Sequence, residues 1–83
     1  MYIYTMNITK HAFDRMKERG MTTEMLASMM KGRTFVRDGM DGRFLVTGRA
    51  DGKMWTVVLD DDYYTVVTVR RAHEDEEALW NSR

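Results

Sequence analysis

Five residues near the two ends of the chain have the chemistry needed to handle a phosphate group. His11, Arg15 and Arg19 follow one another at intervals of four residues, so a helix would carry all three on one flank. Histidine titrates close to neutral pH and transfers protons, whereas arginine holds phosphate oxygens with paired N–H donors. Arg70 and Arg71, near the other end, can supply further positive charge. Metal-independent RNA cleavage needs these groups, because a base activates the 2′-hydroxyl and cations stabilise the phosphorane.

The candidate residues divide into two sets by expected role. The predicted catalytic residues are His11, Arg15 and Arg70. The predicted substrate-binding residues are Arg19, Arg71, Trp55 and Tyr64, the two aromatic rings through stacking on bases. The second proton-transfer group stays open among Asp14, Glu18, Tyr63 and Tyr64. Several candidates also have a purely structural interpretation. His11 could sit in the first helical turn and donate a hydrogen bond to a strand carbonyl, the arginines could form ion pairs, and Trp55 could belong to the core.

The N-terminal part of the chain predicts two short helices. In residues 10–19 the apolar positions Ala12, Phe13 and Met16 fall on one helical face, with Thr9 as N-cap and Gly20 as stop. A second helix starts after Thr22 or Thr23 and ends at Gly32. The two helices form a hairpin, and the first carries the His11/Arg15/Arg19 flank.

The remainder predicts an antiparallel meander. Runs of alternating apolar residues separated by Gly- and Asp-rich turns indicate four strands, at residues 33–38, 43–49, 53–60 and 63–71. Residues 2–6 add a short edge strand. We therefore expect one α+β domain, 1–83, in which an N-terminal helix hairpin packs on one face of a twisted four- to five-stranded antiparallel sheet. The other face is left to solvent or to a partner.

Composition excludes several classes of site. The 83 residues include no cysteine and only two histidines, so we predict no disulfide, no metal site and no cofactor. The start of the chain lacks the features of a signal peptide, and no apolar run is long enough to span a bilayer. We expect a cytoplasmic protein without membrane contact.

The acidic C-terminal tail, residues 73–83, balances a mildly basic body. Residues 1–72 contain 12 Lys and Arg against 9 Asp and Glu, whereas the tail adds Glu74-Asp75-Glu76-Glu77 and Arg83, so the whole chain has zero net charge. We expect this tail to form one or two helical turns. Three interpretations stay open: a solvated terminal helix, a mimic of a nucleic-acid backbone, or an intramolecular shield over a basic face.

Two stretches carry a family resemblance. "ITKHAFDRMKERGMTTEML" and "WTVVLDDDYYTVVTVRRA" resemble the opening and closing motifs of a group of small uncharacterised bacterial and phage domains. That group is similar to the RelE/ParE-like toxins and to the wider barnase/colicin-like ribonuclease fold. The resemblance covers residues 8–72 and implies a RelE-like fold. At Arg70 the chain has a cation where the closing motif usually has tyrosine.

Two functions follow as hypotheses. The first is a small toxin-like protein, a metal-independent ribonuclease acting on RNA or the translation machinery, with a cognate antitoxin. The second is a non-catalytic protein of a phage or mobile element that inhibits a host protein or nucleoprotein complex through its sheet face and acidic tail. RNA, an antitoxin, a host protein and a second copy of the chain in a homodimer all stay open as partners.

Overall fold

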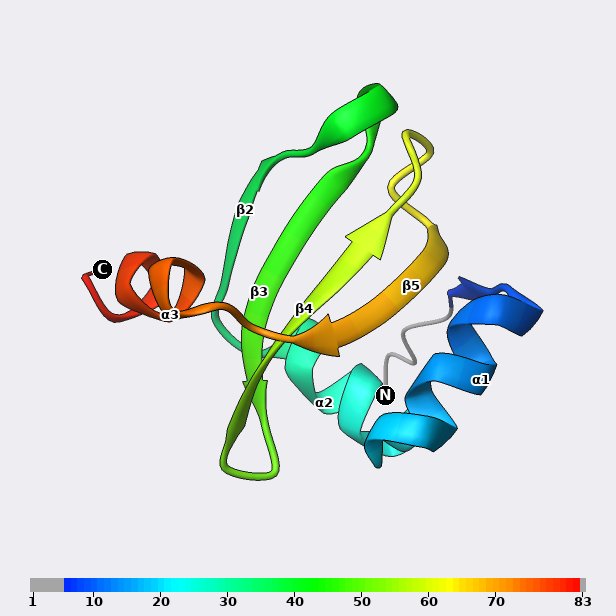
Figure 1. Ribbon diagram of the computed structural model, residues 1–83, viewed down its shortest axis with the longest axis horizontal. Helices are drawn as coiled ribbons and strands as arrows, with labels where there is room; N and C mark the ends of the chain where they lie inside the picture. The colour runs from blue at the N-terminus through cyan, green and yellow to red at the C-terminus, as the bar shows by residue number, and fades with distance from the viewer. Residues whose placement is uncertain (1–5, 83) are drawn as a thin grey trace.

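The computed structural model describes residues 6–82 and shows an α+β domain built on a five-stranded mixed sheet (Figure 1). The elements in chain order are β1 (Asn7–Ile8), α1 (Lys10–Arg19), α2 (Thr23–Lys31), β2 (Thr34–Asp38), η1 (Met40–Gly42), β3 (Phe44–Ala50), β4 (Lys53–Leu59), β5 (Thr65–Arg71) and α3 (Glu74–Asn81). Among the described residues, no helix is long and apolar enough to cross a membrane.

The two N-terminal helices begin and end where the sequence predicts. The Thr9 side chain accepts a hydrogen bond from the Ala12 N–H and so caps α1, and Gly20 ends it in the left-handed conformation with φ 80°. Thr22 caps α2 in the same way by accepting from the Met25 N–H. The predicted helix over residues 10–19 is confirmed.

The sheet has the strand order β1-β5-β4-β3-β2. The four long strands form the predicted antiparallel meander. The expectation of an entirely antiparallel sheet is wrong for β1, which pairs parallel to β5 through Asn7↔Thr65 and Ile8↔Val66. A tight turn forces antiparallel pairing, but β1 and β5 are separated by both helices and three strands, so no turn sets their relative direction. The predicted edge strand at 2–6 falls almost wholly outside the described residues.

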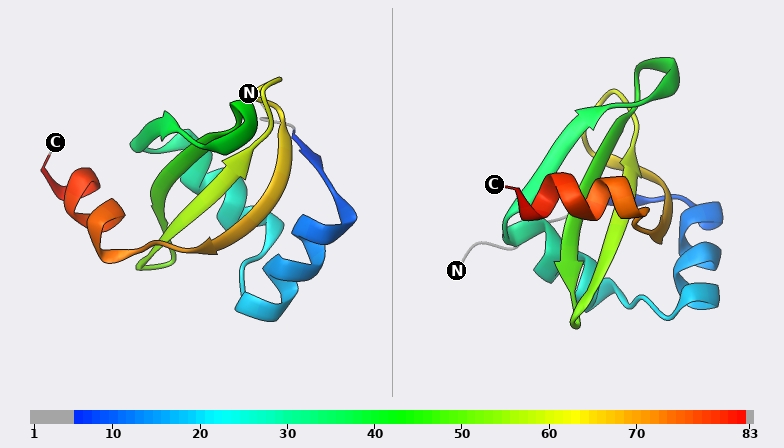
Figure 2. Two further views of the ribbon diagram at one scale, coloured as in Figure 1. Left: turned by 45° about the horizontal axis from the view of Figure 1, so that its top comes forward. Right: turned by 60° about the vertical axis from the view of Figure 1, so that its left-hand side comes forward.

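The sheet has two unlike faces. On one face α1 and α2 cover the core, in which Trp55, Val57 and Leu59 of β4 are buried together with Met16 and Met29 of the helices. On the opposite face α3 lies across β2 and β3 (Figure 2). The expectation that helices would cover only one face is therefore wrong. The reason is that the acidic tail folds back as a helix instead of extending into solvent.

Candidate functional site

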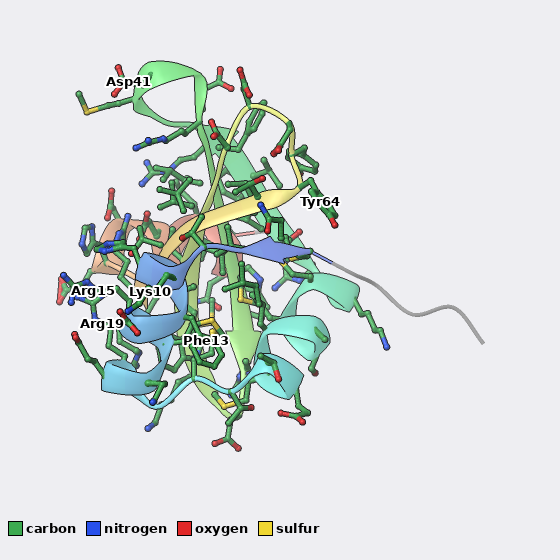
Figure 3. All side chains as sticks on the ribbon, turned by 90° about the vertical axis from the view of Figure 1, so that its right-hand side faces the viewer. Lys10, Phe13, Arg15, Arg19, Asp41 and Tyr64 are labelled. Atoms are coloured by element: carbon green, nitrogen blue, oxygen red, sulfur yellow. The ribbon has the colours of Figure 1, made fainter. Side chains whose placement is uncertain are left out.

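In the predicted catalytic flank on α1, His11 and Arg19 are exposed and Arg15 is half-buried. His11 is exposed and has no hydrogen-bond or ion-pair partner among residues 6–82. One Nη of Arg15 lies 2.8 Å from a carboxylate oxygen of Glu18, one turn along the helix. Nη1 of Arg19 donates to the main-chain oxygen of Val69 on β5 at 2.6 Å. Arg15 and Arg19 extend from the same side of α1 (Figure 3), so this flank presents two guanidinium groups to solvent.

Arg71 lies on the same face of β5 as Val69, the residue that holds Arg19. Its Nε donates to the Met54 carbonyl oxygen at 3.1 Å, and its guanidinium carbon lies 5.3 Å from the centre of the Trp55 ring. Residues two apart on a strand are separated by about 6.6 Å along it, so Arg71 lies close along β5 to Val69, the anchor of Arg19. The structure therefore brings Arg71 towards the α1 flank.

The two predicted stacking rings do not join this flank. Trp55 is 1% exposed, and its indole N–H donates to the Ala50 carbonyl oxygen at 3.2 Å, so its faces are unavailable to a base in this conformation. Tyr64 is 48% exposed, but it precedes β5 and lies well away from Arg15 and Arg19 (Figure 3). Trp55 is thus a core residue, and Tyr64 belongs to another part of the surface.

Arg70 lies on the opposite face of the sheet. Side chains alternate along a strand, and Arg70 sits opposite Thr56, whereas Val69 and Arg71 face the helices. The structure therefore does not bring Arg70 together with His11 and Arg15. Its two Nη atoms instead donate to the two carboxylate oxygens of Glu76 on α3, at 2.7 and 2.8 Å.

Glu76 is the centre of a buried polar cluster between α3 and the sheet. Its carboxylate, which is 0% exposed, also accepts from Arg37 Nη2 at 2.8 Å and from the Thr56 hydroxyl at 2.9 Å. The His73 backbone N–H donates to it at 2.8 Å, as in a capping box. Thr56 has one hydroxyl proton, which it gives to Glu76, so Thr47 must be the donor in the 2.9 Å bond between the two threonines.

These contacts decide the charge of the cluster. Burial by itself would raise the pKa of Glu76, but the hydrogen bonds from Arg70, the His73 backbone, Arg37 and Thr56 outweigh it and hold the pKa well below its usual range. Glu76 is therefore ionised at neutral pH. One donor is left over: Arg37 Nε is buried and has no hydrogen-bond partner among residues 6–82.

A second contact holds the C-terminal half of α3. The guanidinium carbon of Arg33 lies 3.8 Å from the centre of the Trp80 ring, and the two residues exchange hydrogen bonds with each other's main-chain oxygens at 2.9 and 3.1 Å. Glu74 and Asp75 remain exposed. The acidic tail therefore contributes one carboxylate to the interior and leaves at least two on its outer surface.

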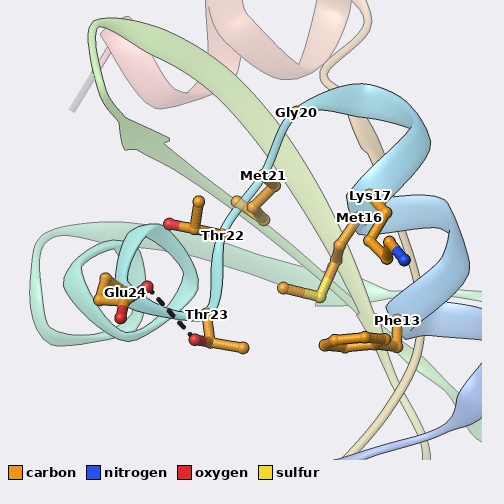
Figure 4. A pocket seen from close by; sticks show the side chains of 8 residues that line it. All are labelled: Phe13, Met16, Lys17, Gly20, Met21, Thr22, Thr23 and Glu24. Atoms are coloured by element: carbon orange, nitrogen blue, oxygen red, sulfur yellow. Dashed lines mark hydrogen bonds between the residues drawn. The ribbon is translucent and has the colours of Figure 1, made fainter.

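Residues 6–82 line at least two surface grooves. One, of about 430 Å³, lies between α1 and α2 and is lined by Phe13, Met16 and Met21 with polar residues of the intervening turn (Figure 4). The other, of about 520 Å³, lies at the far end of the α3 face and is lined by Arg37, Asp38, Gly39, Met40, Arg43, Leu45 and Val58. Arg37 is thus shared by the Glu76 cluster and the second groove.

Sequence reasoning did not identify Arg37, Thr56 and Glu76 as one group. Strand alternation places Arg70 beside Thr56 once the register is known, but Arg37 comes from the far edge strand and Glu76 from a separate helix.

The described residues contain no group of three or more His, Cys, Asp or Glu side chains that could hold a metal ion. Comparisons of the chain with family models, curated proteins and solved structures find no significant match.

Proposed function

We propose that this is a small toxin-like protein that acts on RNA, and that the outer flank of α1 is the surface that binds the RNA backbone. The observation that carries the proposal is the row of His11, Arg15 and Arg19 on α1, in which His11 and Arg19 are exposed and Arg15 is half-buried, with Arg71 two residues along β5 from Val69, which holds Arg19. The helix hairpin on an antiparallel meander also agrees with the fold that the RelE/ParE-like resemblance implies.

The way in which two of the arginines are held supports phosphate binding. Arg19 and Arg71 each donate one N–H to a main-chain oxygen of the sheet, Val69 and Met54 respectively. A guanidinium has five N–H donors, so each keeps several for a ligand while its position is fixed. Less side-chain entropy is then lost when a phosphate binds.

His11 is the proton-transfer group in this proposal. It would take the proton of the 2′-hydroxyl, whose oxygen attacks phosphorus and displaces the 5′-oxygen, and Arg15 would stabilise the charge on the phosphorane. The two carboxylates of α1 already have partners, because Asp14 lies 3.2 Å from Lys10 and Glu18 lies 2.8 Å from Arg15. The leaving oxygen would therefore take its proton from water or from protonated His11.

The test is induced expression in a bacterial host, with growth and total RNA integrity followed together. Wild type should arrest growth with RNA cleavage, and His11→Ala and Arg15→Ala should each abolish both effects. Lys31→Ala is the matched control, since it removes an exposed positive charge at the end of α2. Growth arrest that persists in the His11→Ala variant would refute the catalytic role of this residue.

Binding can be measured separately from cleavage. Fluorescence anisotropy with a labelled oligoribonucleotide should show an affinity that falls with salt, and Arg15→Ala or Arg19→Ala should each reduce the slope of log K against log salt by about one. An unchanged slope in both variants would exclude the α1 flank as the backbone-binding surface.

The alternative proposal is a non-catalytic protein of a phage or mobile element that inhibits a host protein. The observation that favours it is the exposed acidic surface of α3, where Glu74 and Asp75 face solvent. Healthy growth with intact RNA, together with a host protein captured by wild type but lost with Glu74→Lys/Asp75→Lys, would favour this function over the first.

A further inference from the structure

We propose that Arg37, Arg70 and Thr56 form a binding site for a phosphate group, and that Glu76 of α3 occupies this site as an internal ligand. The site lies on the opposite sheet face from the α1 flank, so the proposal goes beyond the function proposed above and stands without it. The three residues come from β2, β5 and β4, which are strands of one continuous sheet.

The donor set suits an oxyanion. Arg70 presents both Nη atoms to the two carboxylate oxygens, Arg37 presents a third N–H, and the Thr56 hydroxyl presents a fourth donor, all between 2.7 and 2.9 Å. Paired guanidinium donors with a hydroxyl are the groups that proteins use to hold phosphate. A carboxylate has two oxygens, whereas a phosphate has more, and the buried Nε of Arg37 is a donor without a partner among the described residues.

The attachment of α3 is unusual for a packed helix. Of its eight residues, the one that is fully buried is the charged Glu76, while Ala78 and Leu79 are exposed. Helices in globular proteins are generally held by a stripe of buried apolar side chains. Here the buried anchor is ionic, with Trp80 stacked on Arg33 as the second attachment. An anion that competes for Arg37 and Arg70 would therefore remove a main attachment of the helix.

The neighbouring groove offers space for the rest of a phosphate-bearing ligand. Its lining includes Arg37 of the Glu76 cluster, a further cation, Arg43, and the apolar side chains of Leu45 and Val58. Met40, which is 82% exposed, also lines it. A sugar or base attached to a phosphate bound at Arg37 and Arg70 could thus lie against Leu45 and Val58, with Arg43 as a third cation.

The experiment uses the full chain with Glu76→Ala and measures the melting temperature at pH 7.5 as inorganic phosphate is added. Chloride at equal ionic strength is the reference. Phosphate should fill the vacated site and raise the melting temperature by about 5 °C or more at saturating concentration. The wild type and Glu76→Ala/Arg70→Gln should show no more than the chloride effect, and Lys31→Ala, which removes an exposed positive charge from α2, should leave the response of the Glu76→Ala background intact.

A second arm distinguishes the source of the phosphate. An oligoribonucleotide with a 5′-hydroxyl carries only backbone diesters, so a response to it identifies the site as one for RNA backbone. A response to inorganic phosphate alone identifies it as one for a free or terminal phosphate group. No rise with either probe in Glu76→Ala, or an equal rise in the Arg70→Gln double variant, overturns the proposal.

The wild type provides a readout that does not depend on the folding of the variant. Phosphate that competes with Glu76 should increase hydrogen exchange of the α3 amides by about threefold or more, because local opening governs exchange there. The α1 amides serve as the internal control and should not change. If Glu76→Ala fails to fold even with phosphate present, and exchange in α3 of the wild type is also unaffected, the proposal is refuted.

Discussion

Replacement of Glu76 by glutamine should lower stability strongly and in a pH-dependent way. The substitution keeps the shape of the side chain but leaves Arg37 and Arg70 without their shared counter-charge. Removal of one member of a buried ion pair destabilises by about 3–5 kcal/mol. The side chains of Arg37 and Arg70 are 34% and 25% exposed, so they recover some hydration, and we expect the lower end, about 3 kcal/mol.

The direction of the pH effect follows from the lowered pKa of Glu76. Hydrogen bonds from Arg70, the His73 backbone, Arg37 and Thr56 overcome the effect of burial and keep the folded-state pKa below the unfolded value. The stability that ionised Glu76 contributes is therefore fully present above the unfolded-state pKa of about 4.3, and it is lost as the pH falls below that pKa. The loss amounts to at most about 1.4 kcal/mol per pH unit.

Urea denaturation followed by tryptophan fluorescence and circular dichroism measures this effect. The free energy of unfolding of wild type should exceed that of Glu76→Gln by about 3 kcal/mol from pH 7 to about pH 5, and the difference should shrink towards pH 3. Glu74→Gln is the matched control, because it removes a charge from the exposed side of the same helix and should change stability by less than about 0.5 kcal/mol. A difference below about 1 kcal/mol at pH 7, or one that stays constant down to pH 3, would refute the reasoning.

Two further predictions concern the framework. Gly48→Ala should destabilise the fold by about 1–3 kcal/mol, because the added Cβ would lie 2.9 Å from Met29 Cγ in the core. Gly32→Ala is the control and should be tolerated, since its Cβ would have no contact closer than 3.6 Å. Thermal unfolding of both variants checks this. Asp62→Ala should lower the melting temperature, because the Asp62 carboxylate accepts hydrogen bonds from Tyr64 and Thr65 at the start of β5. Those bonds lower the pKa of Asp62, so the stability that Asp62 contributes should be lost in acid. Equal melting temperatures of variant and wild type at pH 7 would contradict the prediction.

The sequence determined the local elements. Thr9 and Gly20 are residues that start and stop a helix through their own geometry, so the bounds of α1 could be predicted without knowledge of the rest of the chain. The Asp51-Gly52 pair likewise places the turn between β3 and β4, where both residues have positive φ. Alternation along the predicted strand 53–60 places Trp55, Val57 and Leu59 on one face, and all three are buried. The position of His11, Arg15 and Arg19 on one side of α1 also follows from helical spacing.

Only the tertiary structure decided which distant residues meet. The parallel pairing of β1 with β5 forms only after the chain has passed through β2, β3 and β4, and no local sequence signal specifies it. Arg70 could be assigned to a face only once its register with Thr56 was known. In the sequence Glu76 is one of four neighbouring acidic residues of the tail. In the structure it is the one of the four that is fully buried, because α3 packs where Arg37 and Arg70 contact its carboxylate. Local backbone preferences act over a few residues, whereas this cluster depends on charges from three distant elements.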